Sequence, residues 1–125
     1  MTIQPVATQP VLTTELTEWL LTSAIPTIRF KTRTELMGES ASAAADDQAA
    51  IMQDGPVPAL LAKQLENGTW VHETHYYTPK YTSTHWTLLL LAELAIDGQN
   101  PQFQHGIEYM LTTTTAEIER GLTHR

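Results

Sequence analysis

The fold of this chain is decided by the stretch from 83 to 96, which reads STHWTLLLLAELAI. A polar start at Ser83 or Thr84 can begin a helix, and Asp97 with Gly98 can end it. The apolar residues between them fall on nearly every side of that helix. Because a helix that is apolar all round is usually buried, we expect this segment to lie at the centre of the fold.

Further helices are predicted on both sides of this stretch from capping residues, prolines and glycines. They run from Thr13 or Thr14 to about Leu20, from Pro26 to Met37, from Ser42 to Gln53, from Pro56 to Gln64 and from Pro101 onward. The run Thr112–Thr115 is β-branched, so we expect the last helix to fray or break there. No segment alternates as a strand does, which predicts an all-α fold of five to six helices.

Length and composition bound the kind of protein. The chain has 125 residues, no cysteine and a formal net charge of −7, and this length fits one domain. We expect residues 1–11 to be a disordered lead-in and residues 12–125 to be a single helical domain. The absence of cysteine excludes disulfides, thiolate zinc sites and cysteine nucleophiles. The acidic charge argues against a nucleic-acid partner.

The sequence carries no pattern of a targeting or membrane segment. The first dozen residues hold two prolines and no basic residue, unlike a signal peptide. The most apolar run, Leu88–Ile96, includes Glu93 and is far shorter than the roughly 20 residues that cross a bilayer. The sequence therefore predicts a cytoplasmic protein without a membrane span.

A glutamine–glycine–tryptophan motif follows the fourth predicted helix. Residues Gln64–Trp70 read QLENGTW, which fits the pattern Q-x-x-x-G-x-W. Gln64 can hydrogen-bond backbone groups at a neighbouring helix end, and Gly68 permits a turn with positive φ. Trp70 can shield those hydrogen bonds from water. The motif predicts a structural clasp between helical hairpins rather than a reactive site.

This motif resembles the QW repeat of squalene–hopene cyclases and related terpenoid cyclases. Together with YTPKY at 77–81 and the stretch from 83 to 94, it resembles uncharacterised bacterial proteins with a prenyltransferase- and squalene-cyclase-like fold. The resemblance covers about residues 13–114. It implies antiparallel helical hairpins that form part of an α/α toroid, with about three of its roughly five to seven hairpins.

The catalytic motifs of those relatives are missing here. The cyclases resemble one another in an Asp-x-Asp-Asp acid motif, whereas Asp46 and Asp47 lack the leading aspartate. Protein prenyltransferases bind zinc through Asp, Cys and His, and this chain has no cysteine. A partial toroid leaves the sides of its inner helices uncovered. We therefore expect a non-catalytic module without a cofactor, which binds or self-associates as a homodimer or higher homo-oligomer.

An alternative function follows from the aromatic connection at residues 67–83, since long loops are often functional. Its rings, and those at the start of the next helix, can line a pocket for an apolar, isoprenoid-like ligand, or can pack as ordinary core. These ligand-binding candidates are Trp70, Tyr76, Tyr77, Tyr81, His85 and Trp86. A terpene-cyclase-like enzyme would use His85 or Glu93 as proton donor. Glu93 can instead pair at the surface with Lys80 or Arg29.

Three histidines offer ligand types suited to zinc, namely His72, His75 and His85. The first two do not have the H-E-x-x-H spacing and lie in a predicted loop. Exposed loop histidines commonly bond to backbone or water, so we predict no metal site.

Two small groups of charged residues lie in the first half of the chain. Asp46 and Asp47 fall on an exposed side of their predicted helix. Arg29, Lys31 and Arg33 occupy alternate positions, which point apart on a helix. We therefore predict no anion site at these basic residues.

Overall fold

The computed structural model describes residues 13–123, which fold into six α-helices and one π-helical turn. The helices are α1 (Thr14–Leu21), α2 (Pro26–Lys31), α3 (Ala45–Ile51), α4 (Pro56–Leu61), α5 (Thr84–Glu93) and α6 (Pro101–Thr123), and the π-helical turn η1 (Thr32–Leu36) continues α2. No strand occurs within this range, so the all-α prediction is confirmed. The predicted lead-in at residues 1–11 lies outside the described residues.

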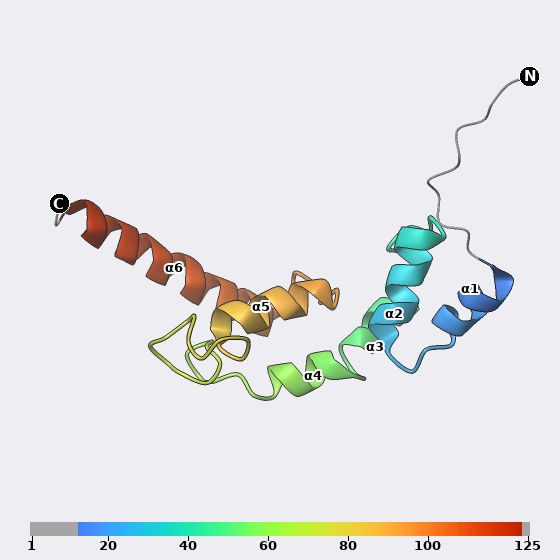
Figure 1. Cartoon of the computed structure of the whole chain (residues 1–125), viewed down its shortest axis with the longest axis horizontal. Helices are drawn as coiled ribbons and strands as arrows, with labels where there is room; N and C mark the ends of the chain where they lie inside the picture. Colours follow the sequence, from blue (N-terminus) through green and yellow to red (C-terminus); the bar gives the residue numbers. More distant parts are fainter. Residues whose placement is uncertain (1–12, 124–125) are drawn as a thin grey trace, which may run out of the picture.

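The helices form two groups with α4 between them (Figure 1). One group holds α1, α2, η1 and α3, and the other holds α5 and α6, which run side by side in opposite directions. The hydroxyl of Thr27 on α2 donates a hydrogen bond of 2.6 Å to the carbonyl of Leu94, just after α5. Lys31 Nζ lies 3.7 Å from the carboxylate of Glu93. The end of α5 therefore joins the two groups.

The helix starts follow the capping signals in the sequence. The backbone N–H of Leu16 donates to the side chain of Thr13 at 3.1 Å, so Thr13 caps α1 as expected. Pro26 begins α2, where its missing N–H leaves no bond unmade. Gly38 has φ +73° just beyond the helical segment, and Gly55 has φ +85° just before α4. Glycine adopts this left-handed backbone without the steric cost of a side chain.

The core collects around α5 from both groups of helices. Its buried apolar members are Ile51, Val57, Leu61, Trp70, Leu88, Leu91 and Ile96. However, Leu89 is 52% exposed and Leu90 is 45% exposed. The expectation that α5 is covered on every side is therefore wrong. Its neighbours within the described chain bury Leu88 and Leu91 and leave Leu89 and Leu90 about half exposed.

The last helix does not break at Thr112–Thr115, so that prediction is wrong as well. The helix α6 runs unbroken through these residues to Thr123. The hydroxyl of Thr115 donates to the carbonyl of Leu111 at 2.8 Å within the helix. Two residues further on, Glu117 accepts a hydrogen bond from the Tyr76 hydroxyl at 2.7 Å. The propensity penalty of a β-branched residue is below about 0.7 kcal/mol, which such tertiary contacts can offset.

Candidate functional site

The glutamine–glycine–tryptophan motif joins α4 to the first turn of α6. Gln64 Nε2 donates to the carbonyl of Gly68 at 3.1 Å and to the carbonyl of Gln102 at 2.8 Å. In return, Gln102 Nε2 donates to the carbonyl of Leu61 at 3.2 Å. That carbonyl belongs to the last turn of α4 and also accepts the backbone N–H of Gln64 at 3.1 Å. The side chain of Gln64 thus makes the contacts of a clasp, which is a structural role.

Trp70 completes this clasp from inside the core. Its side chain is 2% exposed, and its Nε1 donates to the carbonyl of Leu60 at 2.7 Å. Its backbone N–H donates to the hydroxyl of Thr84 at 2.8 Å, in the first turn of α5. Gly106 on α6 lies so close that a Cβ placed there would be 3.1 Å from Trp70 Cζ3. Trp70 therefore fixes three helices relative to one another.

Four of the six predicted ligand-binding residues come together around Trp86. The ring centroids of Tyr77, Tyr81 and His85 lie 5.2, 5.0 and 5.4 Å from that of Trp86. These are the separations of rings in direct contact, so the rings fill the space between themselves. Trp86 Nε1 donates to the carbonyl of Tyr77 at 3.0 Å. Lys80 Nζ lies 5.3 Å from the centroid of Tyr81, a cation–π distance.

Tyr76 lies apart from this ring cluster and supports α6. Its hydroxyl donates to Glu117 at 2.7 Å, and that hydrogen bond raises the pKa of Tyr76. A second tyrosine, Tyr109 on α6, donates from its hydroxyl to the carbonyl of Glu73 at 2.9 Å. These two hydrogen bonds hold the aromatic connection against α6. The connection supplies the donor in the first bond, and α6 supplies the donor in the second. Tyr76 therefore acts as a strut in this structure.

The three candidate zinc histidines do not converge. The rings of His72 and His75 contact each other edge-on with centroids 5.8 Å apart. His85 contacts Tyr77 and Trp86 instead. Over residues 13–123, no group of three or more His, Asp or Glu side chains is placed to hold a metal ion.

The two candidate proton donors have different surroundings. The side chain of Glu93 is 84% exposed and pairs with Lys31 at 3.7 Å. The partner comes from α2 and is neither Lys80 nor Arg29. Because Glu93 is exposed and ion-paired, the interpretation of Glu93 as a buried acid does not hold. His85 is half-buried beside α6, among apolar side chains.

An ion-pair cluster between α2, η1 and α3 was missed from the sequence. Arg29 Nε lies 2.8 Å from Asp47, and Arg33 lies 2.7 Å from Asp46, 3.0 Å from Asp47 and 3.1 Å from Glu39. The prediction that the basic residues point apart is wrong for Arg29 and Arg33, because they are four residues apart and share a helix face. The side chain of Asp46 is 76% exposed, as expected, whereas that of Asp47 is only 14% exposed. The hydrogen bond from Arg33 lowers the pKa of Asp46. The arginine charges are neutralised inside the cluster.

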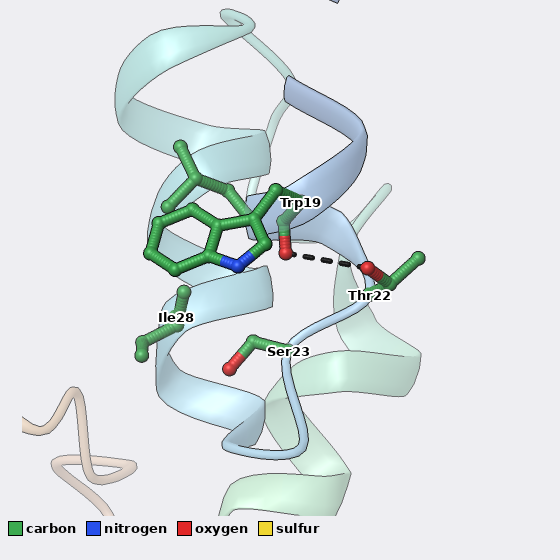
Figure 2. A pocket seen from close by; sticks show the side chains of 5 residues that line it. Trp19, Thr22, Ser23 and Ile28 are labelled. Atoms are coloured by element: carbon green, nitrogen blue, oxygen red, sulfur yellow. Dashed lines mark hydrogen bonds between the residues drawn. The ribbon is translucent and has the colours of Figure 1, made fainter. Parts of the chain in front are cut away.

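A small pocket lies between α1 and α2 (Figure 2). Figure 2 shows the indole of Trp19 beside the side chain of Ile28, with Thr22 and Ser23 at the edge. The Thr22 hydroxyl donates to the carbonyl of Trp19 at 3.3 Å. Leu20 completes the lining, which contains no ionisable side chain. This pocket can offer apolar contact and two hydroxyls, and no group for acid–base chemistry.

Two larger surfaces lie on either side of α5. The first, the α5–α6 strip, is lined by His85, Leu88, Leu89, Ala92, Phe103, Ile107, Met110 and Leu111. The second, the α4–α5 groove, is lined by Leu60, Lys63, Leu65, Trp70, Val71, Tyr81, Thr82, Thr87 and Leu90. Sequence reasoning marked three of these residues, His85, Trp70 and Tyr81, and the leucines were assigned to the core. The exposure of these leucines depends on which neighbouring helices cover α5. The spacing of apolar residues within α5 does not determine that.

Comparison of the chain with protein families, with curated proteins and with solved structures finds no significant match. The resemblance to terpenoid cyclases therefore rests on the motifs quoted above. Within residues 13–123, every helix is too short or too polar to cross a bilayer.

Proposed function

We propose that this chain is a non-catalytic helical module, built as part of an α/α toroid, that self-associates through the α5–α6 strip. The supporting observation is the uncovered apolar surface of that strip. Leu89 on α5 and Leu111 on α6 are both more than half exposed. Every residue that lines the strip is apolar except His85. Contiguous exposed apolar patches mark interaction surfaces.

A second copy of the chain is the partner that this surface fits. With 23 residues, α6 is about 35 Å long, whereas the ten residues of α5 reach about 15 Å. Beyond the amino-terminal end of α5, the exposed apolar residues Ile118 and Leu122 continue the helix face of Ile107 and Leu111. In a dimer with twofold symmetry, both copies contribute the same surface to the interface. The α6 of one copy would therefore cover the strip of the other.

Light scattering coupled to size-exclusion chromatography tests this proposal at micromolar concentration. We expect a dimer for the natural chain and a monomer for Leu111→Glu, since a carboxylate in an apolar interface loses its hydration. The matched control is Leu36→Glu on η1, an exposed leucine outside the strip, which should stay dimeric. Circular dichroism verifies that each variant is helical. A natural chain that stays monomeric up to about 100 μM would refute self-association.

A second candidate function is the binding of an apolar, isoprenoid-like ligand, as the family resemblance implies. The α4–α5 groove favours it, because two predicted ligand residues, Trp70 and Tyr81, line the groove beside leucines. Its volume of about 640 Å³ falls within the roughly 300–1,000 Å³ typical of small-molecule sites. Native mass spectrometry of the purified protein should show a bound apolar molecule. The variant Leu90→Glu, which places a charge in the groove, should lose it.

A further inference from the structure

The α4–α5 groove carries positive charge in an acidic protein. The chain has 14 acidic and 7 basic residues, yet the groove is lined by Lys63 and by no acidic residue. Lys80 stands next to it, with Nζ over the ring of Tyr81, which also lines the groove. Arg29, Lys31 and Arg33 all pair with carboxylates. By contrast, neither Lys63 in the groove nor Lys80 beside it forms an ion pair with any residue that the structure describes.

Two residues of this groove hold a backbone conformation that side chains disfavour. Val71 has φ +69° and Tyr81 has φ +72°. In the left-handed region a Cβ crowds the following carbonyl, and the effect is strongest for a β-branched residue such as Val71. Both side chains are nevertheless exposed apolar groups, 50% and 69% accessible. Strained backbone often clusters where a protein holds a ligand, and this supports a binding role for the groove.

We propose that the α4–α5 groove binds a single-chain anionic amphiphile, of the class of long-chain carboxylates. This inference rests on the second candidate function and adds the charge of the ligand's head group. The hydrocarbon chain would contact Leu60, Leu90 and Val71, where burial removes apolar surface from water on both sides. The carboxylate would accept hydrogen bonds from the ammonium group of Lys63. The site is a recess with one lining lysine, which suits a free molecule better than a bilayer.

Three probes with the same chain and different head charge test the proposal. They are decanoate, decyltrimethylammonium and 1-decanol, each below the concentration at which it aggregates, with binding followed by tryptophan fluorescence. Trp70 lines the groove and reports occupancy. We expect decanoate to bind most tightly. Lys63→Gln should weaken decanoate binding about fivefold, the effect of one partly exposed charge pair, and leave decanol binding unchanged. Lys31→Gln removes an equal charge outside the groove and should change neither.

The variant Val71→Asn separates a binding role from a structural one. Asparagine tolerates positive φ better than valine does, so we expect a urea midpoint at or above that of the natural chain. Binding of decanoate and of decanol should both weaken, because the apolar contact is lost. A lower midpoint with unchanged binding would show that Val71 serves the fold and would overturn its place in the site.

The outcomes separate the ligand's charge from ligand binding itself. Equal affinity for the three probes, or decanoate binding that is unaffected by Lys63→Gln, overturns the anionic head group and leaves the second candidate function standing. Failure of all three probes to bind overturns both. Binding to phosphatidylglycerol vesicles without saturable binding of decanoate overturns the free amphiphile in favour of a membrane surface.

Discussion

Replacing Gly106 by alanine tests the close packing between α6 and the clasp. A Cβ at this position would lie 2.9 Å from Leu88 Cδ2, 3.1 Å from Trp70 Cζ3 and 3.2 Å from the carbonyl oxygen of Gly68. The methyl group of Leu88 ends a flexible side chain and can turn aside. The ring of Trp70 is held by its hydrogen bond to the carbonyl of Leu60, and the Gly68 carbonyl accepts a bond from the clasp glutamine. Those two groups cannot move without breaking contacts.

Two opposing effects decide the sign of this change. Alanine is favoured over glycine inside a helix by about 1 kcal/mol. Overpacking a filled core costs about 1–3 kcal/mol. We expect Gly106→Ala to lower the free energy of unfolding by about 1 kcal/mol overall, which corresponds to a Tm lower by roughly 3–5 °C.

The matched control is Gly121→Ala in the same helix, where a Cβ meets no atom within 4 Å. It should raise the free energy of unfolding by up to about 1 kcal/mol, since only helix propensity changes. Both variants are compared by urea denaturation followed at 222 nm, at one protein concentration because self-association shifts apparent stability. Equal stabilisation by the two substitutions would refute the close approach of α6 to Trp70.

Two other changes probe polar contacts. Gln64→Leu removes three hydrogen bonds of the clasp and should lower the free energy of unfolding by about 1–3 kcal/mol. The substitution Gln53→Leu at an exposed position should leave the urea midpoint nearly unchanged, and equal midpoints for the two variants would contradict the clasp. The pKa of Asp46 is lowered in the folded state by Arg33, so its contribution to stability is present above the unfolded pKa of about 3.9 and is lost as the pH falls through the lower folded pKa. At pH 7 the Arg33→Gln variant should therefore have a lower free energy of unfolding than the natural chain. Between pH 5 and pH 2, measured by urea titration, its free energy of unfolding should fall by less. An equal fall in both proteins would argue against this pairing.

Local signals in the sequence predicted the helices well. Thr13, Pro26, Pro56 and Pro101 mark helix starts because capping and proline geometry depend on adjacent residues only. The run Thr112–Thr115 was assigned wrongly because its helix is supported by contacts with a distant connection. Weak local preference yields to such contacts.

The candidate site was predicted in part. The ring cluster around Trp86 combines residues from two short neighbouring segments, so their closeness in the sequence already brings the rings together. The ion-pair cluster was missed because the three basic residues were compared at a spacing of two, at which side chains of a helix point apart. Arg29 and Arg33 are four residues apart and therefore share a helix face. The exposed sides of α5 could not be predicted from the residues of α5 alone. They depend on which helices are present to cover α5, and periodicity reports only that a residue is apolar.

The hydrogen bond from Thr27 to Leu94 joins positions 67 residues apart. A chain shortened to begin at α4 would leave the Leu94 carbonyl without this donor and would remove Phe30 and Ile51 from around the core. Water would then have to donate the hydrogen bond to this carbonyl at the end of α5. Construction of a minimal folding unit must therefore retain the amino-terminal helices, even though neither of the two proposed binding surfaces includes a residue from them.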